Sequence, residues 1–315
     1  MIESFTITNG LNESYVLPLR GPSSQGLLIT SVTGLGPVNA NINSDDMAIG
    51  DGSIVNSSRI SSRNIVFSIK FATFDRSYND FTTIESVRRK TYSIFPVKEK
   101  ISIVIKTVDN KRVKEYYIDG YVETNEPDIF SDKEGCQVSV ICPDPYFYDI
   151  DSTRLSQSSV TPLFHFPYSN ESINEPKTVF GFLDNTYNYI RFDSSVDIGF
   201  EIRVRFHDNG TRLIVTCADN EDFISPEVLK IDHYYLAESE VSICTEKNKK
   251  RATYTLSNDV ETTILDGLVV EESTWLKLHH GDNYIKVTAV SENTGLETSS
   301  IVSYEILYRT KYIGV

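Results

Sequence analysis

The residue types that most often carry chemistry are few in this chain and stand far apart. The five histidines are His165, His207, His233, His279 and His280, and none has the spacing of a metal-binding motif. The adjacent His279 and His280 would point to opposite sides of an extended chain, which is typical of a surface or a turn. This pattern predicts no metal site.

The spacing of the cysteines does not indicate a disulfide framework or a metal site. Cys136, Cys142, Cys217 and Cys244 contain no CxxC pair and have no regular spacing. A chain of 315 residues can build a core without disulfides. We therefore expect four reduced, buried thiols.

Motifs for nucleotide binding and hydrolysis are missing. Gly34 and Gly36 are followed by Pro37, without the third glycine and the helix that a phosphate-binding loop needs. No serine occupies a GxSxG turn, and no Cys/His pair can be chosen from spacing alone. Asp144 and Asp149 flank an aromatic segment, where turn and cap roles explain them. We expect neither catalytic residues nor a cofactor.

Trp275 is the sole tryptophan, and its ring is a candidate platform for stacking a sugar. In an extended chain it would share a face with Lys277 and His279, while Leu276 and Leu278 take the other face. We favour a packing role for Trp275. A sugar platform is the alternative.

Composition indicates a globular, mostly β protein. Hydrophobic residues make up 40% and charged residues 23%, with 18 Tyr and 16 Phe against 2 Met. The net charge is -14, and it is uneven: residues 1–149 hold 15 Lys and Arg against 19 Asp and Glu, the remainder 15 against 25. Such an acidic chain is not expected to bind nucleic acid or an anionic membrane.

The N-terminus and the hydropathy indicate a soluble protein. Residues 1–10 lack the basic start and apolar run of a signal peptide, and no stretch approaches about 20 apolar residues. We expect synthesis in the cytoplasm, with neither a signal peptide nor a transmembrane segment.

The N-terminal half predicts strands with a single helix. Apolar runs lie at residues 5–8, 15–17, 27–32, 101–105, 114–118 and 137–142, and residues 63–71 alternate most clearly. Asp51-Gly52 is a hairpin or bulge signal. Residues 79–95 instead show the three-and-four spacing of a helix, with Asn79 or Asp80 as its cap.

The segment after residue 142 predicts a domain edge. Pro143 and Pro145 remove backbone donors and end the preceding strand. Tyr146, Phe147 and Tyr148 follow at once, so we expect this exit to be pinned to an apolar surface. Because single cores seldom exceed about 250–300 residues, we predict two domains, 1–149 and 150–315.

The second half predicts an antiparallel sandwich. Nine short strand-like runs lie at residues 177–180, 189–192, 200–206, 212–217, 240–244, 252–256, 275–278, 284–289 and 304–309. Turn signals separate them, and no helical pattern competes.

Several segments together resemble the distal tail protein (Dit) family of long-tailed phages. They are residues 26–38 (GLLITSVTGLGPV), the Asp51-Gly52 turn, the spacing of Arg59 and Arg63 before an alternating strand, and residues 141–149 (ICPDPYFYD). WLKL at 275–278, GDN at 281–283 and the closing YIGV are similar to the family's second domain. The resemblance spans nearly the whole chain, except for residues 150–174 and the linking regions of the second half.

The resemblance implies a structural protein and no enzyme. In that family the N-terminal domain is a partly open β barrel with one α-helix, and the C-terminal domain is a galectin-like antiparallel β sandwich. Six copies form a ring at the virion tail tip, between the tail tube protein and a tail-tip protein. A tape measure protein and a receptor-binding protein are further expected partners. The alternative function is a carbohydrate-binding module that attaches a particle or an enzyme to cell-surface glycans.

Two groups of residues follow as candidates within that picture. A ring needs hairpins or sheet edges that reach a neighbouring copy. We predict this interface near the Asp51-Gly52 hairpin and the strand carrying Ile65, Phe67, Ile69 and Phe71. The interdomain joint is predicted at Pro143, Pro145, Tyr146, Phe147 and Tyr148.

Overall fold

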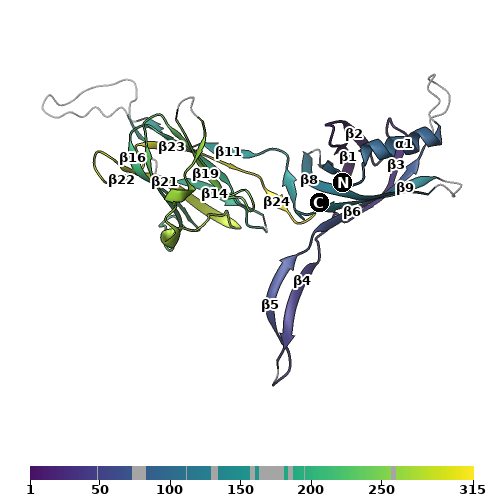
Figure 1. Ribbon diagram of the computed structural model, residues 1–315, viewed down its shortest axis with the longest axis horizontal. Helices are drawn as coiled ribbons and strands as arrows, with labels where there is room; N and C mark the ends of the chain where they lie inside the picture. The colour runs from purple at the N-terminus through teal and green to yellow at the C-terminus, as the bar shows by residue number, and fades with distance from the viewer. Residues whose placement is uncertain are drawn as a thin grey trace. The chain divides into compact units, whose positions relative to one another are not determined.

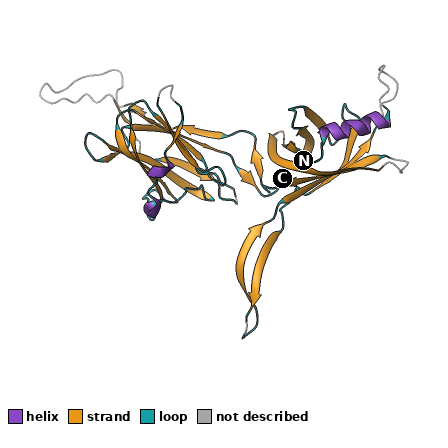
Figure 2. Ribbon diagram, in the orientation of Figure 1, coloured by secondary structure: helices purple, strands orange, loops and turns teal. Residues whose placement is uncertain are grey.

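A computed structural model describes residues 1–47, 49–72, 83–110, 112–128, 134–156, 160–162, 181–183, 187–194, 196–256 and 260–315. These residues form a mainly β protein of two compact units (Figures 1 and 2). Unit 1 comprises Met1–Ile150 together with Lys311–Val315, and unit 2 comprises Asp151–Thr310. The last five residues lie in unit 1, although the predicted C-terminal domain included them, because they pair with strands there. Among the described residues, no helix is long and apolar enough to cross a membrane.

Unit 1 is built on one antiparallel sheet that curls into a half-barrel (Figure 1). The strand order along it is β2-β1-β7-β8-β9-β6-β3, and β10 joins β8 and β24 beside this path. The bounds are β1 (Ile2–Thr8), β2 (Ser14–Pro18), β3 (Leu27–Thr33), β6 (Arg63–Phe71), β7 (Lys100–Asp109), β8 (Arg112–Asp128), β9 (Gly135–Cys142), β10 (Phe147–Asp149) and β24 (Lys311–Tyr312).

Period-two patterning determines which face of this sheet is buried. In β6, predicted at these same bounds, Ile65, Phe67 and Ile69 are buried while the residues between them face outward. Phe67 meets Phe5 edge to face at 5.4 Å and Phe95 at 5.8 Å between ring centroids. The inward side chains of these strands therefore form the core of unit 1.

The helix α1 (Ile84–Ile94) covers part of this core. Thr83 caps it, since its hydroxyl accepts a hydrogen bond from the Ser86 amide at 3.2 Å. The caps predicted at Asn79 and Asp80 lie outside the described residues. Val87, Thr91 and Ile94 form the buried stripe, at spacings of four and three, so the predicted helix is confirmed. Its apolar residues Ile84 and Tyr92, which belong to the predicted pattern, are exposed instead.

Between β3 and β6 the chain leaves the sheet as a two-stranded arm. Strands β4 (Ala40–Asp46) and β5 (Ser53–Ile60) pair antiparallel and extend away from the half-barrel (Figure 1). The turn between them contains Asp51-Gly52, so the predicted hairpin signal is confirmed. Every residue of both strands is exposed.

The described residues of unit 2 form two larger antiparallel sheets, as expected for a β sandwich, and a separate two-stranded one. One has the order β11-β23-β15-β18-β19-β20, the other β14-β21-β16-β17 with β22 beside β21, and β12 pairs with β13. The bounds are β11 (Thr153–Ser156), β12 (Val160–Pro162), β13 (Gly181–Leu183), β14 (Asn188–Phe192), β15 (Glu201–Phe206), β16 (Gly210–Ala218), β17 (Glu227–Tyr235), β18 (Glu240–Cys244), β19 (Arg251–Thr255), β20 (Thr262–Thr263), β21 (Gly281–Ser291), β22 (Glu297–Thr298) and β23 (Val302–Tyr308). Two 3-10 turns, η1 (Leu265–Gly267) and η2 (Val270–Glu272), lie between β20 and β21.

Inward side chains of both sheets fill one core in unit 2. Phe200, Phe206 and Tyr235 are its largest fully buried side chains, and the Phe206 and Tyr235 rings stack at 4.4 Å. Strand β17 was not predicted. Residues 275–278 were predicted as a strand but make only the isolated bridge of Leu278 with Ile198. The strand predicted at 177–180 lies outside the described residues.

Candidate functional site: the β4–β5 arm and its root

The arm is amphipathic although both of its faces are exposed. The register pairs Ala40 with Ile60, Ile42 with Ser58, and Ser44 with Val55, so these side chains share one face. Ile42, Val55 and Ile60 are 61%, 60% and 40% exposed. We call this side the apolar face of the arm.

The opposite face of the arm is mostly polar and internally hydrogen-bonded. Asn43 Nδ2 donates to Ser57 Oγ at 3.1 Å, and Asn56 Nδ2 donates to Asp45 Oδ2 at 2.6 Å. The pairing shifts by one residue between Asn43 and Ser44, which places Asn56 beside Asp45. Ile54, which pairs with Asp45, is the exposed apolar side chain on this face, whereas Ala40, Ile42, Val55 and Ile60 lie on the apolar face.

The root of the arm is closed by a glycine turn and by the C-terminal residues. Gly34 has a φ of +87°, and a Cβ there would lie 2.0 Å from the Asn64 carbonyl oxygen. No other residue fits at that position without a shift of the backbone. The Val315 amide donates to the Leu35 oxygen at 3.0 Å, which ties the C-terminal segment to the same turn.

Arg63, the first residue of β6, connects the parts of this root. Its side chain is fully buried and donates to four backbone carbonyls, those of Gly34, Gly36 (2.6 Å), Pro145 (2.7 Å) and Ile313. Burial lowers the pKa of the guanidinium, yet an arginine side chain stays charged in proteins. We call this arrangement the Arg63 node, because it joins segments up to 250 residues apart in the chain.

Of the predicted joint residues, Pro145 and Phe147 contact Arg63 at this node. The Phe147 ring is buried beneath the Arg63 guanidinium, with 4.3 Å between the guanidinium carbon and the ring centroid. The Tyr148 hydroxyl donates to Asp144, and Lys311 Nζ lies 5.7 and 5.2 Å from the Tyr146 and Tyr148 ring centroids. The exit after β9 is therefore pinned to unit 1, as the aromatic run predicted.

The predicted ring-interface residues fall into two groups. Asp51 and Gly52 lie at the exposed tip of the arm. Ile65, Phe67 and Ile69 belong to the buried core of unit 1, and Phe71 is half-buried against it. The core strands bury these side chains because they sit on the inward face of β6, so in this fold they are not available to a neighbouring copy.

Trp275 and His279, the candidate residues of unit 2, each contact neighbouring side chains of the fold. Trp275 is partly buried against the core, and Lys250 Nζ lies 5.0 Å from its ring centroid. His279 lies between carboxylates, 3.2 Å from Asp197 and 3.4 Å from Glu227. Among the described residues, no group of three His, Cys, Asp or Glu side chains could hold a metal ion. His165 lies outside the described residues.

All four cysteines are free and buried, as predicted. Burial raises the pKa of Cys136, Cys142 and Cys217 to about 12, and it also raises the pKa of Cys244. At pH 8 the folded thiols are therefore neutral and covered, whereas unfolded cysteines titrate near about 8.5.

We expect four thiols that are silent towards a thiol reagent such as DTNB in the native protein and react promptly in denaturant. A time course at pH 8 with and without 6 M guanidinium checks this, with absorbance as the measure of released thiolate. Fast reaction of any thiol before unfolding would contradict the burial described above.

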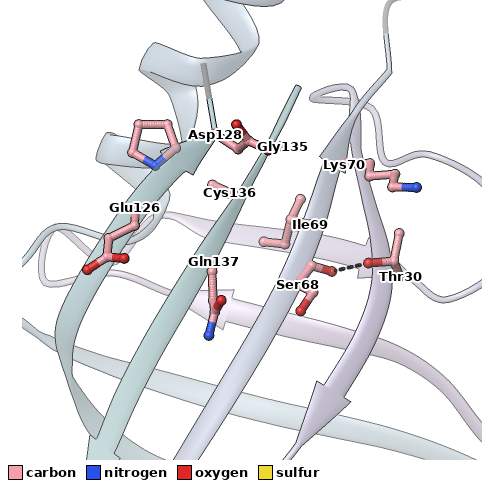
Figure 3. Close-up of a pocket in the computed structure, with 10 residues that line it drawn as sticks. Thr30, Ser68, Ile69, Lys70, Glu126, Asp128, Gly135, Cys136 and Gln137 are labelled. Carbon is pink, nitrogen blue, oxygen red and sulfur yellow. Dashed lines mark hydrogen bonds between the residues drawn. The ribbon is translucent and has the colours of Figure 1, made fainter. Parts of the chain in front are cut away.

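A shallow hollow lies on the outer face of the unit 1 sheet, where β3, β6, β9 and β8 run side by side (Figure 3). Thr30 sits at a register shift between β3 and β6, and its hydroxyl donates to the Ser68 oxygen at 2.9 Å. The rim mixes Lys70 with Glu126 and Asp128. This hollow brings together charges of both signs but no arrangement of a nucleophile with a base.

Comparison with known proteins finds likeness in structure alone. No protein-family model matches the sequence, and no curated protein matches it either. The Dit protein of phage SPP1, gp 19.1, described as a paradigm of the hub adsorption apparatus in phages that infect Gram-positive bacteria, aligns with a TM-score of 0.63. The match covers 97% of this chain and 99% of that one at 12% identity.

Chains of the phage p2 baseplate, in its activated conformation with Sr or Ca, align at 11% identity and a TM-score of 0.45, over 98–99% of this chain and 99–100% of those. The likeness to SPP1 Dit spans both units. This chain therefore shares the fold of the SPP1 Dit protein over nearly all of its length.

Proposed function

We propose that this protein is a structural tail hub, six copies of which close a ring at the end of a phage tail tube. The shared fold with SPP1 Dit supports this, because the match covers nearly all of both chains. The observation that carries the proposal is the arm. It is an exposed two-stranded ribbon with one apolar face. Contact with another protein surface would bury that face.

An isolated two-stranded hairpin is marginally stable in water, because it has no apolar layer to cover its inner face. Burial of each Ile or Val side chain would contribute about 1.5–3 kcal/mol. A second copy of the chain supplies the cover when the arm of each copy lies on the next. Such a head-to-tail contact uses two different surfaces and closes into a ring when the rotation per copy divides a full turn.

Within this proposal the ring lies at the virion tail tip and contacts the tail tube protein on one side and a tail-tip protein on the other. A tape measure protein and a receptor-binding protein are further partners. The role is structural and needs no catalytic residue. The segment from Pro143 to Tyr148 acts as the joint, since the Arg63 node fixes its backbone just before the chain passes into unit 2.

Light scattering on the purified full chain tests the proposal. We expect a species of six times 35.6 kDa, about 214 kDa, or ring particles in negative stain. Because a ring of this kind can depend on its neighbours, the measurement is repeated with the tail-tip protein added. A chain that stays at 35.6 kDa in both conditions would contradict the proposed ring.

A further inference from the structure

Unit 2 carries a cluster of four aromatic rings on the outer face of one sheet. The ring centroids of Tyr187 and Tyr284 lie 5.3 Å apart, those of Tyr189 and Tyr284 5.2 Å, and those of Tyr187 and Phe223 6.0 Å. Tyr189 and Tyr284 are cross-strand partners on β14 and β21, and their neighbours Ile190 and Ile285 face the core. These rings therefore lie on the side of the sheet away from the core.

The cluster is open to solvent at Tyr189, which is 49% exposed. Ile224, in the loop that carries Phe223, is 67% exposed. We call this surface, formed by Tyr187, Tyr189, Phe223 and Tyr284, the tyrosine patch. Contiguous exposed apolar patches rimmed by polar residues mark interaction sites.

Polar groups at the edge of the tyrosine patch can form directional hydrogen bonds. The Tyr189 hydroxyl donates to Asp282 Oδ1 at 2.7 Å, and the Tyr187 hydroxyl donates to Glu221. Arg191 and Asp282 are the next cross-strand pair on the same face, so a guanidinium and a carboxylate stand beside the exposed ring. The patch thus offers an apolar ring face flanked by acceptors and a planar donor.

We propose that the tyrosine patch binds a neutral saccharide, with a pyranose ring lying on Tyr189. The C–H face of a pyranose packs on an aromatic ring, while its hydroxyls donate to carboxylates and accept from a guanidinium. Asp282, Glu221 and the nearby Asp219 and Asp222 make the surroundings acidic, which disfavours anionic glycans.

This site is separate from Trp275, the platform considered from the sequence. The Trp275 ring packs against the core and has Lys250 over one face, whereas Tyr189 presents its ring to solvent. The inference does not depend on the proposed hub role. The two proposals can fail separately: the protein can form a hexamer without binding sugar, or it can bind sugar as a single chain.

Isothermal titration of the full chain with chitotriose and with maltotriose tests the inference. We expect saturable binding of at least one of them with a Kd of about 1 mM, as is ordinary for a shallow site. Tyr189→Ala should weaken binding about tenfold or more, and Asp282→Asn should weaken it less. Both side chains are on the surface, so each change should lower the melting temperature only slightly, through the loss of the Tyr189–Asp282 hydrogen bond and, in Tyr189→Ala, of the ring contact with Tyr284.

Tyr234→Ala is the matched control. Tyr234 is 48% exposed and donates to Glu292 at 2.7 Å, but it lies on β17 and outside the patch. Its replacement should leave the Kd unchanged. The inference is overturned if neither sugar binds saturably up to about 10 mM, or if Tyr189→Ala binds as tightly as the unmodified protein. Binding of a tail protein to the patch without any sugar binding would equally overturn it.

Discussion

Replacing Arg63 with methionine should lower the free energy of unfolding of unit 1 by about 3–5 kcal/mol. Methionine fills much of the same volume but donates no hydrogen bond. The carbonyls of Gly34, Gly36, Pro145 and Ile313 would then lose a charged donor in a place from which water is excluded. Each unsatisfied buried acceptor costs about 1–3 kcal/mol, partly relieved if water enters.

Urea unfolding followed by tyrosine fluorescence and circular dichroism measures this loss. Arg63→Lys should recover only part of it, because a single ammonium cannot reach four carbonyls in the planar arrangement of a guanidinium. Arg59→Met is the control, since Arg59 is exposed on the arm. A midpoint for Arg63→Met equal to that of the control would mean that the node does not stabilise unit 1.

Placing charges on the apolar face of the arm should abolish the ring while leaving each chain folded. In the double variant Ile42→Asp and Val55→Asp, two side chains that are 61% and 60% exposed in the single chain become acidic. Folding of the chain does not bury them, so its stability should change little. A contact between copies would lose about 3–6 kcal/mol of apolar burial and would have to desolvate two carboxylates as well.

Light scattering reports the result as a fall from about 214 kDa to the 35.6 kDa of one chain. Asn41→Asp with Ser57→Asp adds the same charge to the polar face of the arm and is the control. If both double variants lose the ring, the effect is one of charge alone. If neither loses it, the apolar face is not the contact between copies.

The sequence predicts best where one face of a strand is buried. The alternation of Ile65, Phe67 and Ile69 marked β6 at its observed bounds, because every second residue enters the core. Strand β17 carried a similar signal in Leu229, Ile231 and Tyr235, and it could have been found. The arm strands could not be found that way, since neither of their faces is buried in the single chain.

The candidate site was predictable only in part, for a physical reason. The Asp51-Gly52 turn is a local signal, and it correctly marked the tip of the arm. The role of Arg63 depends on carbonyls that lie 27 to 250 residues away in the chain. Every residue carries a backbone carbonyl, so the sequence does not show which of them will accept a hydrogen bond from Arg63. The tyrosine patch was missed because its members stand up to 97 residues apart in the chain. Tyr189 and Tyr284 meet through the pairing of β14 with β21, and Phe223 reaches Tyr187 from the loop between β16 and β17.

The return of the chain to unit 1 has a consequence for biosynthesis. Strand β24 and Ile313 follow the whole of unit 2 in the sequence, yet they pair with β10 and accept a hydrogen bond from Arg63. Chains leave the ribosome from the N-terminus onward at about 5–20 residues per second. The arginine is thus synthesised long before its last acceptor, and unit 1 remains incomplete until translation has passed unit 2. The Arg63 node can therefore form only after β24 and Ile313 have been synthesised. We expect two copies of the chain to assemble through their arms only after that point.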